Sequence, residues 1–292
     1  MVDQSINFIP PEIHINDING ISEKEFSILS RKLFNETGIT LNESKKQMIE
    51  GRLSRRLREL GLATFKQYIE FLKKNPSENE LFINSLTTNK TDFFREAEHF
   101  HYLAKVVLPQ FIDSGENKFR LWSAASSSGE EVYSLSIILH EFFSVREYGQ
   151  YDFKIVGTDI DTEVLQKAQQ GIYGRNLLAP VRPEFIIKYF KKIPNPGNDG
   201  VNDRYMVKNE LKRIIKFRTF NLLKSEFSTP IKFNVIFLRN VLIYFLPETI
   251  EMVINKMYEH LLPGGYLFLG HSEALININH RFKYIKNSIY VK

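Results

Sequence analysis

The sequence predicts a parallel, doubly wound α/β sheet preceded by a small helical domain, because its character changes once along the chain. Residues 21 to 85 hold short amphipathic segments that begin near Ser, Thr or Asn, and the first two end at Gly, as helices commonly do. From about residue 117, apolar strand-like runs alternate with helix-like runs. Such alternation is typical of a parallel sheet covered by helices on both faces.

The expected elements follow in order along the chain. The helical segments are SEKEFSILSRKLFNETG, NESKKQMIEGRLSRRLRELG, TFKQYIEFLKKN and SENELFINSL. The α/β part runs through KFRLWSAAS, GEEVYSLSIILHEFF, DFKIVGTDI, DTEVLQKAQQG, KFNVIFLRNVLIYF, PETIEMVINKMYEHLLPGG and YLFLGHSE. The last segment, RFKYIKNSIYVK, predicts an antiparallel hairpin at the edge of the sheet. Between residues 173 and 221, KKIPNPGNDGVNDRYMV indicates loops or a small appended sheet.

Composition narrows the possible chemistry. The 292 residues are 43% hydrophobic, enough for a mid-sized domain and a smaller one. The absence of Cys excludes disulfides, thiolate nucleophiles and Cys-ligated metals, and the seven His form no HExxH pair. No apolar run reaches 18 residues and no signal peptide is visible, so we expect a cytoplasmic protein without membrane insertion. The net charge of +5 favours an acidic partner.

Polar residues follow three of the expected strands. The turn SAASSSGEE, residues 123 to 131, is built of small residues that let the backbone approach a ligand. Asp159 lies about 30 residues downstream, near the spacing at which an acid binds a ribose. Small residues also make ordinary turns, and Asp161 could simply cap the next helix. Arg239 and Asn240 follow the apolar run VIFL, where side chains face the ligand crevice, although Arg239 could instead cap a helix.

Six segments carry a resemblance to one family: LTTNKTDFFREAEHF, LWSAASSSGEEVYSLSI, GTDIDTEVLQKAQQGIY, FNLL, FNVIFLRNVLIYF and LPGGYLFLGHSEAL. In this order and spacing the chain resembles the CheR-type chemotaxis receptor methyltransferases from about residue 22 to its end. The resemblance implies a Rossmann-like class I S-adenosylmethionine-dependent methyltransferase domain over residues 101–292, with a β-subdomain insert at about 174–215. It also implies an all-α N-terminal domain over residues 1–85, and a linker or lid over 86–100 that contributes to the cofactor site.

The activity implied by the resemblance is transfer of a methyl group from S-adenosylmethionine to glutamate carboxylates of chemoreceptors, the methyl-accepting chemotaxis proteins. The products are glutamate 5-O-methyl ester and S-adenosylhomocysteine, made in chemotaxis adaptation. An ionised glutamate, whose ordinary pKa is about 4.3, is already an oxygen nucleophile at neutral pH. No general base and no metal is therefore implied, and alignment of the reacting atoms can contribute about 7 to 11 kcal/mol.

The resemblance also assigns roles to individual residues. The implied cofactor-binding residues are Asn89, Thr91, Arg95, Glu131, Asp159, Asn221, Leu222, Arg239 and Asn240. Within this set Glu131 faces the methionine ammonium, Asp159 the ribose, and Asn221 with Leu222 the adenine. Arg95 and Tyr244 are implied to act in catalysis by positioning. Whether Arg95 holds the substrate or the carboxylate of the cofactor stays open, and so does a purely structural ion pair of Arg95 with Glu96 or Glu98.

Several aromatic, apolar and histidine residues complete this picture. Phe93 and Phe94 are expected to anchor the segment in apolar surface. The sequence departs from the family pattern at Val132, where proline is common, and at Leu238, where cysteine is common. Neither departure removes a polar contact, so we expect an active enzyme. His99 and His271 are interpreted as structural rather than catalytic.

A basic helix provides an expected substrate-docking surface. In SKKQMIEGRLSRRLRELG, the side chains of Arg52, Arg55 and Arg58 point away from the apolar face. Such a stripe can dock the acidic, glutamate-bearing cytoplasmic helices of a chemoreceptor. The alternative is an ordinary solvated helix face. In some family members the β-subdomain grips the receptor's C-terminal peptide, and the sequence leaves that open here.

Three other functions are alternatives to glutamate methylation of chemoreceptors. A nucleic-acid methyltransferase is disfavoured because the sequence lacks a basic platform interleaved with aromatic residues, so we expect no nucleic-acid partner. A nicotinamide-dependent oxidoreductase is disfavoured by the absence of a GxGxxG turn. A module that binds S-adenosylmethionine without transferring its methyl group is disfavoured by the presence of Arg95 and Tyr244.

Overall fold

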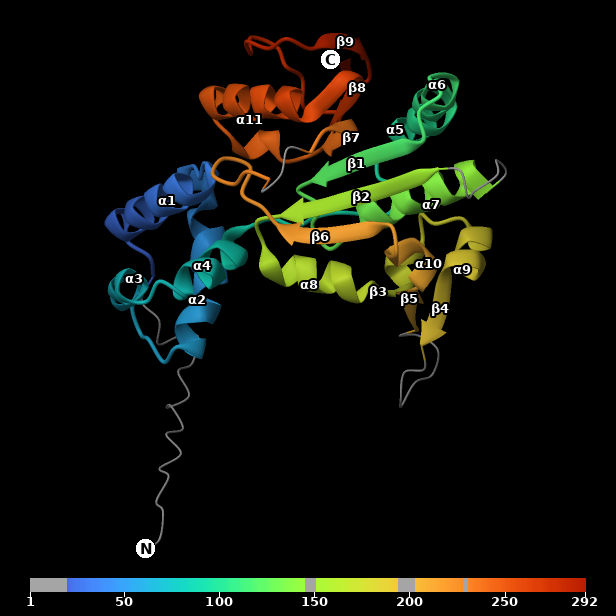
Figure 1. Cartoon of the computed structure of the whole chain (residues 1–292). Helices are drawn as coiled ribbons and strands as arrows, with labels where there is room; N and C mark the ends of the chain where they lie inside the picture. The colour runs from blue at the N-terminus through green and yellow to red at the C-terminus, as the bar shows by residue number, and fades with distance from the viewer. Residues whose placement is uncertain (1–19, 145–150, 194–202, 228–230) are drawn as a thin grey trace, which may run out of the picture. The chain divides into compact units, whose positions relative to one another are not determined.

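The computed structural model describes residues 20–144, 151–193, 203–227 and 231–292 (Figure 1). The predicted helical domain and the predicted loop-rich insert therefore each lie partly outside the described residues. The chain divides into two compact units, residues 1–87 and 88–292. Each unit has its own secondary structure and its own core.

The first unit is all-helical. Its elements are α1 (Glu23–Thr37), the 3-10 turn η2 (Glu43–Lys45), α2 (Lys46–Glu59), α3 (Phe65–Lys74) and α4 (Glu78–Leu86). Ser22 and Thr64 start α1 and α3 with reciprocal capping boxes, and Gly38 ends α1 in the left-handed conformation with a φ of 74°. The four helical segments predicted from the sequence are therefore confirmed.

A buried ion pair joins the helices of this unit. The guanidinium of Arg56 on α2 donates to both carboxylate oxygens of Glu78 on α4, over 2.7 and 2.8 Å. The hydroxyl of Tyr68 on α3 donates to the same carboxylate over 3.1 Å. Ile49, Leu53 and Leu57 form the buried face of α2 at helical spacing, and Arg56 lies at the edge of that face. Three helices thus share one carboxylate.

The second unit is built on a seven-stranded sheet. Its strands are β1 (Lys118–Ala124), β2 (Asp152–Asp159), β6 (Ile215–Thr219), β7 (Phe233–Leu238), β8 (Leu261–Leu269), β9 (Lys283–Lys286) and β10 (Ile289–Val291). They lie in the order β6-β2-β1-β7-β8-β10-β9, and the first five are parallel (Figure 1). The antiparallel hairpin of β9 and β10 lies at one edge, as the sequence predicts, and turns at Asn287 and Ser288 with positive φ.

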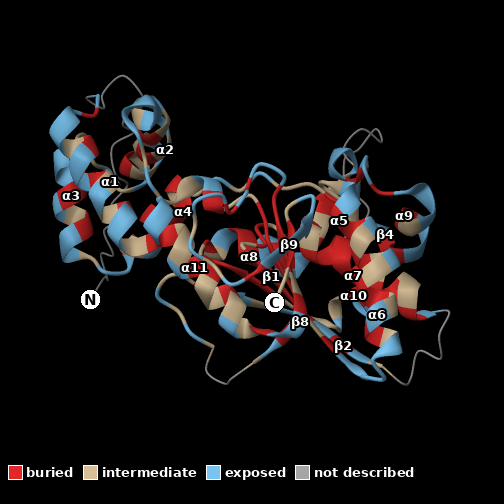
Figure 2. Ribbon diagram, turned by 90° about the horizontal axis from the view of Figure 1, so that it is seen from above, coloured by how far each residue is buried: buried red, intermediate tan, exposed pale blue. Residues whose placement is uncertain are grey.

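Helices cover both faces of this sheet. They are α5 (Ala97–Tyr102), the π-helical η3 (Leu103–Val107), α6 (Leu108–Asp113), α7 (Glu130–Ser144), α8 (Thr162–Gln170) and α11 (Pro247–His260). Adjacent residues of β1 alternate between two cores: Leu121 packs in one with α7, and Trp122 in the other with α11. Figure 2 shows buried residues gathered along β1 and α7. The predicted helical run that ends in LLPGG is helical only to His260. Within the described ranges, no helix combines the length and apolar character needed to cross a membrane.

A small antiparallel sheet is inserted between α8 and β6. It consists of β3 (Ile172–Gly174), β4 (Phe190–Ile193) and β5 (Arg204–Val207), in the order β3-β5-β4. The short helices η5 (Arg175–Leu178), α9 (Pro183–Tyr189) and α10 (Asn209–Lys212) accompany it. The buried ring of Phe93 packs edge-on against Tyr173 and Phe190, with centroids 4.9 and 5.7 Å apart. Phe93 therefore anchors the segment before α5 on this small sheet, in the apolar role the sequence predicts.

Candidate active site

The order of the strands locates the site. The chain passes from β1 outward through β2 to β6, and then returns to β7 on the other side of β1. Ligands of open α/β sheets bind beyond the carboxyl ends of the strands at such a point of reversal. The ends of β1, β2 and β7 are followed by the polar residues that the sequence analysis singled out.

The turn between β1 and α7 has a strained backbone that brings it close to its neighbours. Ala125, Ser127 and Gly129 have φ values of 69°, 48° and 96°. A Cβ at Gly129 would lie 2.9 Å from the Cβ of Ala168, so only glycine fits without displacing α8. Ser126 is buried, and its hydroxyl oxygen has no hydrogen-bond partner among the described residues. A buried polar atom of this kind in a ligand-side turn is suited to contact a bound molecule.

The Asp159 cluster consists of Asn89, Ser127, Asp159 and Asp161. The buried carboxylate of Asp159 accepts the backbone N–H of Ser127 over 2.8 Å and that of Asp161 over 3.0 Å. Burial raises the pKa of Asp159 to about 6, although these N–H groups favour the ionised form. The side-chain amide of Asn89 donates to the carboxylate of Asp161 over 2.7 Å. The backbone carbonyl of Asn89 accepts a hydrogen bond from the hydroxyl of Ser127 over 3.1 Å. Asp161 also caps α8, the role the sequence left open for it.

The Arg239 cluster consists of Glu96, Glu131 and Arg239. The guanidinium of Arg239, whose side chain is 2% exposed, lies 3.0 Å from the Glu131 carboxylate and 2.9 Å from that of Glu96. It also donates to the carbonyl of Arg95 over 2.5 Å. Arg239 is therefore a buried cation shared by two acids rather than a helix cap. Burial is the larger effect at Glu131 and raises its pKa, whereas at Glu96 the opposing effects led by Arg239 outweigh burial and lower the pKa.

Glu273 is a supporting residue that the sequence analysis missed. Its buried carboxylate accepts the backbone N–H groups of Asn240, Leu242 and Gly270, over 2.7, 2.8 and 2.7 Å. This fixes Asn240 in a left-handed conformation with a φ of 59°, from which its amide donates to Glu96 over 3.3 Å. Glu273 follows β8, so the rule that singled out Arg239 after β7 could have found it. For Glu96 the sequence indicates only an ion pair with Arg95, and the contact with Arg239 is visible only in the structure.

Backbone strain concentrates at these clusters. Among the described residues, eight other than glycine have a φ between 48° and 69°, and five of them lie at this site. These five are Phe94, Glu96, Ala125, Ser127 and Asn240. Positive φ costs roughly 1 to 3 kcal/mol at each such residue and persists where the surroundings impose it. Its concentration here supports a functional role for this edge of the sheet.

Three further residues singled out by the sequence are less tightly held than the two clusters: Thr91, Arg95 and Tyr244. The guanidinium of Arg95 is about one third exposed, donates to the carbonyl of Lys90 over 3.0 Å, and lies 4.0 Å from Glu96. That long contact with Glu96 is a weak ion pair. Thr91 is half-buried in the same segment. Tyr244 is half-buried in the 3-10 turn η6 (Leu242–Tyr244), which follows directly after Asn240 and Val241.

Asn221 and Leu222 follow β6. The side-chain oxygen of Asn221 accepts the N–H groups of Leu223 and Lys224, two and three residues further along the turn. Leu222 is buried against the core that contains Phe220. The N–H of Phe220 donates to the carbonyl of Asp159 over 2.8 Å, so the pair lies beside the end of β2.

The predicted docking stripe lies on α2 in the first unit, and its three arginines differ. Arg52 donates to the carbonyls of Leu86 and Thr87, both over 2.9 Å, and so closes the end of α4. Arg55 is exposed and pairs with Glu59 one turn along the helix. Arg58 is half-buried. Arg52 thus stabilises the end of α4, a role that its position in the helical spacing does not predict.

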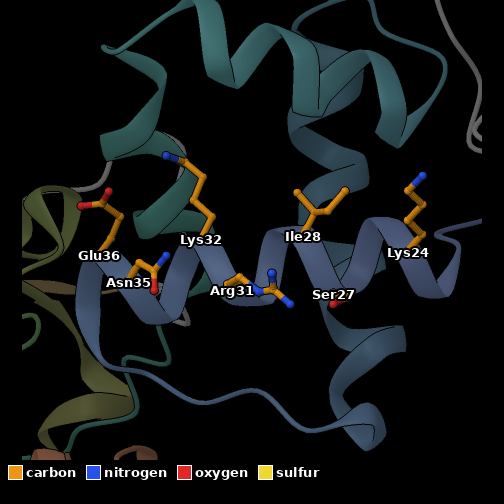
Figure 3. Close-up of a pocket in the computed structure, with 7 residues that line it drawn as sticks. All are labelled: Lys24, Ser27, Ile28, Arg31, Lys32, Asn35 and Glu36. Atoms are coloured by element: carbon orange, nitrogen blue, oxygen red, sulfur yellow. The ribbon is translucent and has the colours of Figure 1, made fainter.

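A second surface feature of the first unit is a shallow depression along α1. Figure 3 shows the side chains that line it, all from this helix: Lys24, Ser27, Ile28, Arg31, Lys32, Asn35 and Glu36. Three of them are basic and one is acidic. The depression contains none of the residues of the Asp159 or Arg239 clusters.

A parallel sheet with a close-approach turn after β1, an acid at the end of β2 and a buried charged pair at β7 defines a site for a nucleotide-bearing cofactor. The residues present fit S-adenosylmethionine. Asp159 can accept ribose hydroxyls, Ser126 offers a buried unsatisfied hydroxyl, and the Arg239 cluster carries charges of both signs for an amino-acid end. This is the arrangement of a class I methyltransferase.

Comparison with known proteins agrees with that class. Residues 89–291 match the family described as CheR methyltransferase, SAM binding domain, and residues 24–87 match CheR methyltransferase, all-alpha domain. The chain belongs to the CheR methyltransferase family and is an S-adenosylmethionine-dependent methyltransferase. It is 39% identical to the chemotaxis protein methyltransferase of Escherichia coli, over 92% of this chain and 91% of that protein. It is 38% identical to chemotaxis protein methyltransferase 2 of Pseudomonas aeruginosa, over 92% and 93%.

Proposed function

We propose that this enzyme transfers the methyl group of S-adenosylmethionine to glutamate carboxylates of chemoreceptors, giving glutamate 5-O-methyl esters and S-adenosylhomocysteine. The observation that carries the proposal is the meeting of the Asp159 and Arg239 clusters at the point where the strand order reverses. One cluster suits the ribose and the other suits the charged methionine end. Similarity to chemotaxis protein methyltransferases supports the choice of chemoreceptors as substrates.

Different residues of the proposed site bind chemically different parts of S-adenosylmethionine. Asp159 accepts the ribose hydroxyls, and Asn221 with Leu222 contributes to the adenine side beside the end of β2. Glu131 and Arg239 serve the ammonium and carboxylate of the methionine end, with Asn240 beside them. Asn89, Thr91 and Arg95 contribute from the segment before α5, which Phe93 anchors. The bound cofactor supplies a methyl group that is already activated by its sulfonium.

The protein's part in the transfer is positioning. A substrate glutamate is ionised at neutral pH, so no residue has to remove a proton from it. Arg95 keeps a partly exposed guanidinium that can donate two parallel hydrogen bonds to a carboxylate. Tyr244 lies in the turn after Asn240 and is assigned to the reacting end of the site. Holding the reacting atoms in line and excluding water are the sources of rate acceleration.

Receptor docking is assigned to the basic face of α2 and to the inserted sheet. Because Arg52 holds the end of α4, Arg55 and Arg58 are the stripe residues whose charges serve an acidic helix. Charge attraction of this kind acts mainly on the association rate and weakens with salt. The outer strands β3 and β4 of the insert suit a receptor's C-terminal peptide, which can add to such a sheet as a strand.

The first test is transfer of a labelled methyl group to membranes that contain chemoreceptors, followed by mild alkali. Label released by alkali establishes a carboxyl methyl ester. Arg95→Ala is expected to lower kcat/KM for the receptor, while Arg281→Ala, which removes an exposed arginine paired with Glu259, leaves it unchanged. Cofactor binding without any alkali-labile label on a receptor contradicts the proposal and favours a different acidic substrate or a non-catalytic module.

A separate test addresses docking. Arg55→Ala and Arg58→Ala together are expected to raise the receptor KM several-fold at low salt, with the cofactor Kd unchanged. The matched control is Lys73→Ala with Lys74→Ala, which also removes two positive charges, from exposed lysines at the end of α3. Equal effects of the control and the double variant would assign the change to overall charge instead of to the stripe.

A further inference from the structure

Two histidines far apart in the sequence meet at Glu96. The Nδ1 atom of His99 on α5 lies 3.6 Å from Oε2 of Glu96, and Nε2 of His271, which follows β8, lies 3.9 Å from the same oxygen. The two imidazole rings have centroids 5.0 Å apart. One donor atom from each of the three residues lies within 4.8 Å of the other two. Neither histidine has a role in the proposed methyl transfer.

The protonation of His99 is fixed by its surroundings. Its side chain is fully buried, and Nε2 lies 2.8 Å from the carbonyl oxygen of Asn287. Since a carbonyl only accepts, Nε2 carries the proton and Nδ1 presents a lone pair. Nδ1 has no hydrogen-bond partner among the described residues. Metal-ligating histidines characteristically donate the other ring N–H to a carbonyl or carboxylate in this way.

The spacing of the three donors suits a small divalent metal ion. Zinc binds histidine nitrogen and carboxylate oxygen at about 2.0 to 2.2 Å in a tetrahedron, which places ligand atoms roughly 3.4 Å apart. The two nitrogen-to-oxygen distances of 3.6 and 3.9 Å are close to that spacing, and the two histidine nitrogens, which lie within 4.8 Å of each other, need to approach by up to about 1.4 Å. The side chain of His271 is 45% exposed, so solvent reaches the group. Oε2 of Glu98 lies 3.8 Å from Nε2 of His271 and is available as a fourth ligand.

We propose that Glu96, His99 and His271 form a binding site for a zinc ion, with Glu98 or water as the fourth ligand. The ion would join α5 to the loop after β8 and so act as a structural staple. The competing cation is Arg239, which lies 2.9 Å from the same oxygen of Glu96, while Glu131 neutralises part of its charge. With zinc and Arg239 both present, the three carboxylates of Glu96, Glu98 and Glu131 balance the charge of the group. With water in place of Glu98 as the fourth ligand, the group carries one net positive charge.

Zinc titration of the untagged full chain, after removal of metals with a chelator, tests the site. We expect one zinc ion per chain by calorimetry and an increase in Tm with zinc, because the ion binds the folded state. His271→Ala keeps the backbone N–H that donates to Glu96 but removes the ligand, and should weaken zinc binding at least tenfold. The matched control, His101→Ala, removes an exposed histidine from the same helix and should leave binding unchanged.

Cobalt provides a second measurement that does not depend on any variant. Co²⁺ bound at this mixed nitrogen and oxygen site with four ligands is expected to give intense visible absorption, whereas surface-bound hydrated Co²⁺ stays pale. The absence of stoichiometric zinc binding overturns the proposal. Equal loss of binding in His271→Ala and His101→Ala, or weak cobalt absorption, also overturns it, since either result assigns binding to scattered surface histidines. All of these readouts are independent of methyl transfer.

Discussion

The two clusters at the carboxyl edge of the sheet hold their carboxylates in different ways. In the Asp159 cluster, Asp159 accepts neutral backbone N–H groups, and burial raises its pKa to about 6. In the Arg239 cluster, Glu96 and Glu131 share one buried guanidinium. A carboxylate held by neutral donors keeps free lone pairs for hydroxyl groups, whereas an ion-paired carboxylate is held to its partner by charge.

This difference indicates a division of labour. Removing one member of a buried ion pair leaves an uncompensated charge, so the Arg239 cluster must stay complete for the fold to be stable. Within the part of the chain that the structure describes, Asp159 forms no ion pair, and we expect its main contribution to be to ligand binding. Changes in the Arg239 cluster should therefore appear mainly as lost stability, and changes at Asp159 mainly as lost cofactor affinity.

The largest expected effect is that of Arg239→Met. The variant leaves Glu96 and Glu131 buried without their cation, and the free energy of unfolding should fall by about 3 to 5 kcal/mol. Urea unfolding followed by circular dichroism measures this change. As a control, Arg182→Met removes an arginine from an exposed pair with Glu184 and should change stability by less than about 1 kcal/mol. Similar losses in the two variants would show that burial of the pair does not matter.

Asp159→Asn should lower cofactor affinity much more than it lowers stability. Its shape is kept, and the lost acceptor for one backbone N–H costs about 1 to 3 kcal/mol. Removal of a buried carboxylate whose pKa is raised to about 6 offsets that loss at neutral pH, so the free energy of unfolding should change little. Cofactor affinity, measured by calorimetry with S-adenosylhomocysteine, should fall at least tenfold. Asp152→Asn, which weakens an exposed pair with Arg120, is the matched control and should leave affinity unchanged. Full cofactor affinity in Asp159→Asn would remove the ribose assignment.

The sequence allowed much of the sheet and one side of the site to be predicted. Asp159 and Arg239 could be found because each directly follows an apolar strand, and such positions meet at one edge of a parallel sheet. Phe93 could be recognised as an anchor because it is apolar within a polar segment. These features depend on local sequence and on one general rule of topology.

Contacts across long sequence separations could not be predicted in this way. Glu96 reaches Arg239 only because a left-handed residue begins α5, and no local pattern announces that conformation. His99 and His271 are 172 positions apart and meet through the packing of α5 on the sheet edge. Arg52 was expected in an outward stripe because helical spacing shows direction but not the carbonyls at the end of α4. The contacts of Glu96, of the two histidines and of Arg52 all depend on tertiary packing, which local sequence patterns do not reveal.

The smallest expected effect is a pH dependence that separates the clusters. Because the pKa of Asp159 is raised to about 6, its carboxylate is ionised above that pH and becomes protonated below it. A protonated carboxyl loses acceptor capacity for the ribose, so the Kd for S-adenosylhomocysteine should rise by up to about tenfold per pH unit below 6. The stability contribution has the opposite sign. The folded state binds this proton more tightly than the unfolded state, so the contribution is present at low pH and is lost as pH rises from about 4 to 6.

Glu96 supplies the internal reference for this titration, whereas Glu131 in the same cluster does not, because burial raises its pKa. The effects led by Arg239 lower the pKa of Glu96, so Glu96 stays ionised throughout this window and should not contribute to the slope. Asp159→Asn should therefore bind weakly but with a Kd that no longer changes between pH 5 and 7. A flat profile in the unaltered enzyme, or an unchanged slope in Asp159→Asn, would mean that a different group titrates. In either case the contrast between neutral-donor and ion-paired carboxylates would not explain how the site binds its cofactor.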